Sequence, residues 1–394
     1  MTAGRRKVAL VVCDSLGVGA LPDAGLYGDE GSDTLGHVAE AVGGLHVPNL
    51  QRWGLGAVAA LRGVPQAREP EAWYGRMAEM SPGKDTTTGH WEMMGLILDR
   101  PFPVYPDGFP AEVVDAFERA IGREVIGNRT ASGTEIIEEL GEEHVRSGRP
   151  ILYASADSVF QLAAHVEVVA LGELYRWCEI ARGILQGANR VSRVIARPFS
   201  GMAGAFRRTG DRRDFSIAPV GATDLDRLAE ADVPVVAVGK VGDIFAYRGI
   251  HRTLHTQDNS SGVAAICETL SGDDPVFCFA NLGDFDSLYG HRNDPAGYAA
   301  AVEDLDGRLP DIEEALSPGD VLILTGDHGC DPTTASTDHS REYVPVLAKE
   351  GSTGGLGGSL GSRSTFADVG ATVCELFGVG RSAPGTSFAS CLRA

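Results

Sequence analysis

The segment Asp320–Ser340, DVLILTGDHGCDPTTASTDHS, places acidic and imidazole side chains directly after a short apolar run. Val321–Leu324 has the length and the glycine boundary of a strand that is buried in a parallel sheet. Asp327 and His328 follow at once, where open α/β sheets bind their ligands. Carboxylate and imidazole together suit divalent Mn, Fe or Zn. A single Asp-His pair is more often a hydrogen bond within a loop, so a metal site requires matching side chains after other strands.

Two other expected strands are followed by side chains of the same kinds. Asp14 follows the run Lys7–Val12, and Asp286 and His291 follow Val276–Asn281. A parallel sheet brings the carboxyl ends of its strands to one edge, so we expect all these side chains to lie together. The six candidate ligands are Asp14, Asp286, His291, Asp327, His328 and His339. They suffice for two metal ions roughly 3.5–4 Å apart, as in phosphatases and nucleases.

Strand and helix patterns alternate along most of the chain, which predicts a doubly wound α/β fold with a mostly parallel sheet. The pattern changes at the proline-rich segment PFPVYPDGFP, which begins at Pro101. The strand–helix pattern of the first part of the chain resumes after about Ser216. We therefore expect a discontinuous metal-binding core made of residues 1–100 and 217–394. Residues 101–216 would form a smaller α/β domain that is inserted into this core as a cap.

The segment Gly83–His90, GKDTTTGH, contains a candidate nucleophile. A threonine hydroxyl is inert near neutral pH and needs a base or a metal to activate it. At a helix N-terminus beside two divalent cations, such a hydroxyl could accept a phosphoryl group. The alternative is that these threonines only cap an expected helix over His90–Leu96. The metal constellation favours the nucleophile.

Residues 190–213 contain seven arginines but only one acidic residue, Asp211. Arginine forks bind phosphate through two hydrogen bonds, so this concentration predicts a distal phosphate site on the inserted domain. Lys240, at the end of a core strand, could join the same site. The alternative is an ordinary solvated surface.

The charge balance restricts the possible partners. The 34 basic and 54 acidic residues give a net charge of −20, which argues against binding to nucleic acid or to an anionic membrane. No apolar run approaches the roughly 18 residues that span a bilayer. The apolar stretch near the start is interrupted by Asp14 and is interpreted as a first strand rather than a signal peptide. The seven cysteines form no C-x-x-C pattern, which favours reduced thiols in a cytoplasmic protein.

Several motifs together resemble the bacterial phosphopentomutases of the alkaline phosphatase superfamily. These motifs are Asp14-Ser15, GKDTTTGHWEMMG, SADS, RVIARPF, VGKVGDIF, DFDSLYGHRND and TGDHGCDPTTASTDHSRE, and the resemblance runs from residue 8 to about residue 390. It implies a core of alkaline-phosphatase type with two Mn²⁺ ions and a cap domain. It also implies the interconversion of ribose 1-phosphate and ribose 5-phosphate, and of the 2-deoxy sugars, through a phosphorylated threonine.

The resemblance assigns roles by position. Thr86 matches the phosphorylated residue, and its oxygen would bind one metal ion with Asp14, Asp327 and His328. The other ion would be bound by Asp286, His291 and His339. In the substrate site, Asp157 matches a residue near the sugar, and Arg193, Arg207 and Lys240 match a phosphate-binding set.

A mutase of this kind would need a sugar bisphosphate, glucose 1,6-bisphosphate or ribose 1,5-bisphosphate, to phosphorylate Thr86 initially. We expect a monomer whose partner is a small sugar phosphate. Three alternatives remain open. A metal-dependent phosphohydrolase would share every ligand but release phosphate. A phosphoglycerate mutase would normally present serine in place of Thr86. A metal-stabilised binding protein would not depend on Thr86 for affinity.

Overall fold

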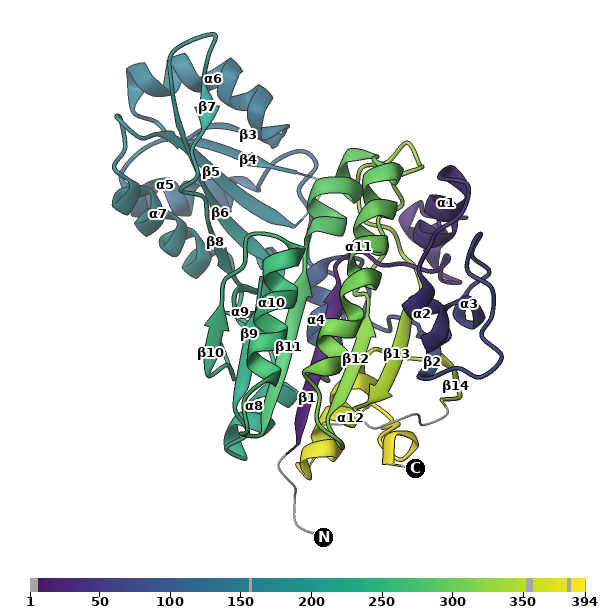
Figure 1. Cartoon of the computed structure of the whole chain (residues 1–394). Coiled ribbons are helices and arrows are strands. Elements are labelled where there is room, and N and C mark those ends of the chain that lie inside the picture. Colours follow the sequence, from purple (N-terminus) through teal and green to yellow (C-terminus); the bar gives the residue numbers. More distant parts are fainter. Residues whose placement is uncertain (1–5, 156–157, 352–356, 381–383, 394) are drawn as a thin grey trace. The chain divides into compact units, whose positions relative to one another are not determined.

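The computed structural model describes residues 6–155, 158–351, 357–380 and 384–393 of the 394-residue chain. The chain divides into two compact units (Figure 1). The first consists of Met1–Arg100 and Pro219–Ala394, and the second is the intervening segment Pro101–Ala218.

The first unit is built on an eight-stranded sheet of order β10-β9-β11-β1-β12-β13-β2-β14. Neighbours from β10 to β12 are paired in parallel, and only β13 runs antiparallel to both strands beside it. The strands are β1 (Lys7–Cys13), β2 (Trp73–Met77), β9 (Val235–Val238), β10 (Arg252–Leu254), β11 (Val276–Leu282), β12 (Val321–Thr325), β13 (Val344–Glu350) and β14 (Ser359–Arg363). The predicted α/β fold with a mostly parallel sheet is confirmed.

Helices cover both faces of this sheet, as the term doubly wound requires. They are α1 (Thr34–Ala41), α2 (Pro48–Trp53), α3 (Leu55–Val58), α4 (Thr86–Met93), α8 (Asp224–Glu230), α9 (Val241–Ile244), α10 (Asn259–Leu270), α11 (Pro295–Glu314) and α12 (Ala367–Phe377). Cys278 and Ala280 of β11 join a core cluster with α1, α2, α10 and α11. Phe279, between them, points to the opposite face, where it stacks on His90 of α4 with ring centroids 5.6 Å apart. On that face α12 contacts both α4 and α8.

The second unit has a smaller mixed sheet of order β3-β4-β5-β6-β7, with β8 also paired to β6. Its elements are α5 (Ala111–Ile121), β3 (Ile126–Thr130), α6 (Gly133–Ser147), β4 (Ile151–Ala154), β5 (Val159–His165), α7 (Leu171–Ile184), β6 (Arg193–Ser200), β7 (Arg207–Arg208) and β8 (Arg213–Ser216). Side chains of α5 and α7 form one core cluster with one face of the sheet. Side chains of α6 form another cluster with the alternate strand residues, such as Ile151 and Tyr153, which point to the other face.

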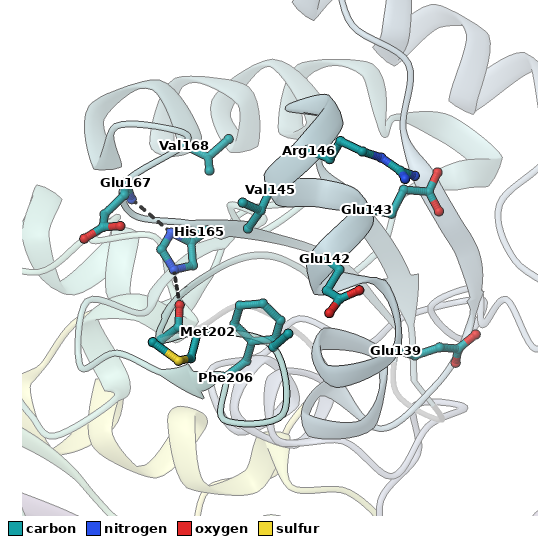
Figure 2. A pocket seen from close by; sticks show the side chains of 12 residues that line it. Glu139, Glu142, Glu143, Val145, Arg146, His165, Glu167, Val168, Met202 and Phe206 are labelled. Carbon is teal, nitrogen blue, oxygen red and sulfur yellow. Dashed lines mark hydrogen bonds between the residues drawn. The ribbon is translucent and has the colours of Figure 1, made fainter.

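A cavity of about 730 Å³ lies within the second unit, between α6, the turn after β5 and the loop after β6 (Figure 2). Its walls carry several glutamates, but Glu139 and Glu143 are paired with neighbouring arginines. Buried His165 has both ring nitrogens hydrogen-bonded. None of the predicted site residues that the structure describes contributes to these walls.

Candidate metal centre

Three adjacent strands deliver the predicted ligands to one edge of the eight-stranded sheet. β1 lies between β11 and β12 and is parallel and in register with both (Figure 1). Asp14 directly follows β1, Asp286 lies in the helical turn Phe285–Tyr289 after β11, and Asp327 follows β12. The close approach of these carboxylates therefore follows from the parallel order of the three strands.

One group of candidate ligands consists of Asp14, Asp327 and His328, all buried, with ligand atoms within 4.8 Å of one another. His328 Nε2 lies 3.4 Å from Asp14 Oδ1 and 3.5 Å from Asp327 Oδ2. These two carboxylate oxygens have no hydrogen-bond partner among the described residues. Burying an ionised oxygen without a donor is costly, so the donor set fits a bound cation.

The second group consists of Asp286, His328 and His339, so His328 belongs to both groups. His339 Nε2 lies 3.4 Å from Asp286 Oδ1, and His291 Nε2 lies 3.3 Å from Asp286 Oδ2. The Nε2 atoms of His291 and His339 are 3.1 Å apart. The structure thus brings together all six side chains that the sequence selected as ligands.

The other ring nitrogens of two histidines are held by backbone carbonyls. Nδ1 of His328 lies 3.0 Å from the oxygen of Gly329, and Nδ1 of His291 lies 2.6 Å from that of Thr337. A carbonyl oxygen only accepts, so each Nδ1 must carry a hydrogen and donate it. Both rings then direct Nε2 at the carboxylates, which is how neutral imidazole is oriented for metal binding.

The buried carboxylates and imidazoles shift one another's protonation. Burial lowers the pKa of His328, but the carboxylates of Asp327 and Asp14 outweigh it and raise this pKa well above its usual value. Burial opposes ionisation of Asp286, yet His339 and His291 hold the pKa of its carboxyl well below its usual value. The Asp286 carboxylate therefore stays ionised and favours added positive charge beside it, whether protons or divalent metal ions.

Thr86 is the first residue of α4, and its Oγ1 lies 3.2 Å from His328 Nε2. The helix is capped by Asp85, whose carboxylate accepts hydrogen bonds from the backbone N–H groups of Thr87 and Thr88. The expectation of a helix that begins at His90 was therefore wrong, because the aspartate cap starts it four residues earlier. Thr86 directs its hydroxyl at the imidazole that both ligand groups share.

Gly89 and His90 bring α4 close to the ligands. A Cβ at Gly89 would lie 2.4 Å from the carbonyl oxygen of Asp327, so only glycine permits this approach. Nδ1 of His90 lies 2.9 Å from the carbonyl oxygen of Thr86 and 3.2 Å from Asp327 Oδ2. His90 was not predicted as a site residue, although its position one helical turn after Thr86 was a usable signal.

Two further buried side chains, which were not predicted as site residues, hold the segment before Thr86. Arg341 donates hydrogen bonds to the carbonyl oxygens of Ser81 (2.8 Å) and Gly83 (2.7 Å). Glu92 accepts hydrogen bonds from the N–H groups of Met80 (2.8 Å) and Ser81 (2.6 Å). The charged residue two positions after the Asp-His pair of the TDHSRE motif was the signal that could have pointed to Arg341.

The predicted substrate residues are in different surroundings. Lys240 lies at the ligand edge, with Nζ 3.2 Å from Asp14 Oδ2. Arg193 begins β6 and forms an ion pair within the second unit, whereas Arg207 is exposed in β7. Asp157 lies outside the described residues.

Arg208 belongs to an arginine cluster with Arg197 and Arg212 around the buried Tyr153. Burial raises the pKa of Tyr153, and these guanidinium groups counteract part of that rise. The Tyr153 hydroxyl has no hydrogen-bonded acceptor among the described residues. Arg212 itself is paired with Asp214 through two hydrogen bonds, at 2.7 and 2.6 Å. The cluster retains an excess of positive charge in an otherwise acidic protein.

Comparison with known proteins identifies the family of this chain. Residues 6–381 match the model of the metalloenzyme superfamily, so the chain belongs to that superfamily. A phosphopentomutase of Anaeromyxobacter dehalogenans (strain 2CP-C) is 58% identical over 389 residues, which are 98% of each chain. A phosphopentomutase of Dictyoglomus thermophilum is 56% identical over 385 residues, again 98% of each. The chain therefore belongs to the phosphopentomutase family and is an enzyme of the mutase type.

Solved structures with lower sequence identity also match. Phosphoglycerate mutase of Leishmania mexicana is 13% identical with a TM-score of 0.48, and the match covers 97% of this chain and 96% of that one. An alkaline phosphatase superfamily protein of Vibrio parahaemolyticus is 12% identical with a TM-score of 0.45, and the match covers 97% of this chain and 69% of that one.

Within the described ranges, no helix combines the length and the apolar character that crossing a bilayer requires.

Proposed function

We propose that this enzyme interconverts ribose 1-phosphate and ribose 5-phosphate, and the corresponding 2-deoxy sugars, through a phosphorylated Thr86. The substrates are those that the name of its relatives implies. The observation that carries the mechanism is the 3.2 Å distance between Thr86 Oγ1 and His328 Nε2. It supports a nucleophilic role because His328 belongs to both groups of candidate ligands.

The proposed cofactors are two Mn²⁺ ions, for which this mixture of carboxylate and imidazole is suitable. When bound, they would acidify the threonine hydroxyl and neutralise phosphate charge. The ligand sets are Asp14, Asp327, His328 and the Thr86 oxygen for one ion, and Asp286, His291 and His339 for the other. Asp14, Asp286 and Asp327 each have a carboxylate oxygen without a hydrogen bond to a described residue, which supports this assignment.

In the proposed reaction, phospho-Thr86 transfers its phosphoryl group to the free hydroxyl of a sugar monophosphate. The phosphorus–oxygen bond to Thr86 breaks, and one to the sugar oxygen forms. The proton of the sugar hydroxyl ends on the freed Thr86 oxygen, from which the return step gives it back to the sugar. The resulting bisphosphate returns its other phosphate to Thr86, which regenerates the phosphoenzyme and leaves the isomer. Glucose 1,6-bisphosphate or ribose 1,5-bisphosphate would phosphorylate an enzyme that has lost its phosphate.

We assign substrate binding to Asp157 for the sugar and to Arg193, Arg207 and Lys240 for the distal phosphate. Arg208 is an additional candidate because it lies in the cluster with uncompensated positive charge. The second unit would act as a cap that excludes water, because a phosphothreonine open to solvent would be hydrolysed.

We also propose a cytoplasmic monomer that acts on small sugar phosphates and has no nucleic-acid or membrane partner. The net charge of −20 supports the absence of polyanionic partners. The cysteines of the described ranges are free thiols, which is compatible with a reducing compartment.

The test is a coupled assay with ribose 5-phosphate, Mn²⁺ and a trace of glucose 1,6-bisphosphate that follows ribose 1-phosphate and free phosphate in the same sample. Isomer formation with little free phosphate is the expected result. The second candidate is a metal-dependent phosphohydrolase, which could use the same ligands. Free phosphate without isomer would establish that activity and exclude the mutase cycle.

A further inference from the structure

We propose that Cys330 gives the metal centre an alternative, sulfur-containing ligand set that captures soft divalent ions such as Zn²⁺ and Cd²⁺. Cys330 is buried, and its Sγ, a ring nitrogen of His291 and a carboxylate oxygen of Asp286 all lie within 4.8 Å of one another. The same Asp286 belongs to the group with His328 and His339. Asp286 thus belongs to two competing ligand sets. In one set its partners are two imidazoles, and in the other they are an imidazole and a thiol.

The distances suit an ion between sulfur and imidazole. Cys330 Sγ lies 4.0 Å from His291 Nδ1, and the bond lengths of zinc to sulfur and to imidazole nitrogen add to about 4.3 Å. An ion can therefore contact both atoms without a large backbone movement. Asp286 supplies a carboxylate oxygen of this group, and its Oδ1 has no hydrogen bond to a described residue. The hydrogen bond of His291 Nδ1 to Thr337 and the weak one of the thiol to Asp338 would be exchanged for metal bonds.

Ligand preference separates the two sets. Thiolates select soft ions, whereas carboxylate and imidazole ligands also suit Mn²⁺. Mn²⁺ is therefore expected to remain with the imidazole set, and Cd²⁺ or Zn²⁺ to move to the set with Cys330. Binding breaks the S–H bond, forms a sulfur–metal bond and releases the thiol proton to solvent. The hydrogen on His291 Nδ1 moves to Nε2, which frees the Nδ1 lone pair for the ion, and no oxidation state changes. An ion in this position withdraws Asp286 and His291 from the Mn²⁺ set and inhibits the enzyme.

The inference rests on the proposed function only through Asp286 and His291 as metal ligands, and its test does not depend on catalysis. The full-length protein, with reduced thiols and without added Mn²⁺, is titrated with Cd²⁺ while sulfur-to-metal charge-transfer absorption is recorded. We expect a band that saturates at one Cd²⁺ per chain. Cys330→Ser should abolish this band. It should also weaken Cd²⁺ binding at least about tenfold, because loss of even a side chain that only supports a metal ligand costs about 10- to 100-fold in metal affinity. Mn²⁺ affinity, measured by electron paramagnetic resonance, should not change.

Cys374→Ser is the matched control, because Cys374 is another buried thiol and its charged neighbours are Asp224 and Arg227 rather than the candidate ligands. It should keep the band. Cys330→Ala, with its melting temperature, guards against a folding defect peculiar to serine. A band that persists in both Cys330 variants would overturn the proposal, as would Cd²⁺ binding to the wild type without a band. A band with Cys330-dependent binding in a protein that lacks mutase activity would leave this proposal standing and refute the proposed function alone.

Discussion

Nη1 of Arg341 donates a 2.7 Å hydrogen bond to the carbonyl oxygen of Gly83, and this contact joins two parts of the candidate site. Arg341 lies two residues after His339, whereas Gly83 lies three residues before Thr86. A second hydrogen bond from Nη1 to the carbonyl oxygen of Ser81 fixes the orientation of the guanidinium. The position of Thr86 relative to the second ligand group therefore depends on one buried side chain.

Arg341→Lys should impair turnover more than substrate binding. Lysine keeps the charge but lacks the planar guanidinium, whose Nε and Nη2 bind Asp23 while Nη1 reaches Ser81 and Gly83. We expect kcat to fall about 100-fold, the cost of displacing a reacting group by about 1 Å, with little change in KM for ribose 5-phosphate. Steady-state mutase kinetics measure this separation of kcat from KM.

Arg363→Lys is a matched control for that experiment. Arg363 is also largely buried and hydrogen-bonds to Asp368 and to the carbonyl oxygen of Thr386, but it contacts neither ligand group. It should lower the melting temperature to a similar degree while kcat stays nearly unchanged. Equal losses of kcat in the two variants would contradict a positioning role for Arg341.

Tyr298→Phe should destabilise the fold at the ligand edge. The Tyr298 hydroxyl donates a 2.9 Å hydrogen bond to the carbonyl oxygen of Ser15, which has a φ of +72°, a conformation that non-glycine residues seldom adopt. The Ser15 N–H in turn donates to Asp327 Oδ1 at 2.9 Å. Phenylalanine keeps the packing but leaves a buried carbonyl without its donor, so we expect a loss of about 1–3 kcal/mol. Urea unfolding measures it.

Tyr289→Phe provides the comparison, because Tyr289 is only partly buried and no hydrogen bond of its hydroxyl is found in the described ranges. Its unfolding free energy should change little. A Tyr298→Phe protein as stable as the wild type would show that Ser15 does not need this support.

The close approach of the candidate ligands was predictable from sequence, because each one follows a strand and the carboxyl ends of parallel strands meet at one edge of the sheet. Arg341 and Glu92 were not, because each meets its partners only in the folded chain. Arg341 and Gly83, for example, are separated by 258 positions. The start of α4 was misplaced because β-branched threonines are weak helix formers, and the Asp85 cap overrides that propensity. The antiparallel direction of β13 was not predictable either, because a short apolar run does not indicate the direction in which a strand pairs.

Removal of metal should make stability fall as the pH rises. Burial lowers the pKa of His328, but Asp327 and Asp14 raise it well above its usual value. Without metal, the folded protein therefore holds a proton that the unfolded chain releases near pH 6.5. This contribution is complete below about pH 6.5 and is lost as the pH rises toward the folded-state pKa. The slope is at most about 1.4 kcal/mol per pH unit for one proton.

Urea unfolding of chelator-treated protein between pH 6 and pH 9, compared with protein saturated with Mn²⁺, measures this dependence. Mn²⁺ has to displace the proton, so its apparent affinity should rise over the same range and the saturated protein should not lose stability in parallel. A chelated protein whose stability stays constant or rises with pH would contradict the proposed coupling between His328 and the two carboxylates.

Thr86→Ala should abolish turnover, because it removes the only oxygen of this side chain that can carry the phosphoryl group. A loss on the order of 10⁴-fold or more is expected for a nucleophile. Thr87→Ala is the control, since Thr87 contributes its backbone N–H to the Asp85 cap and alanine retains that group. Label from radioactive glucose 1,6-bisphosphate should remain on the wild type and on Thr87→Ala, but not on Thr86→Ala. Isomerisation that survives in Thr86→Ala would place the nucleophile elsewhere. Loss of isomerisation without label on the wild type would favour direct transfer between the sugars over a phosphoenzyme.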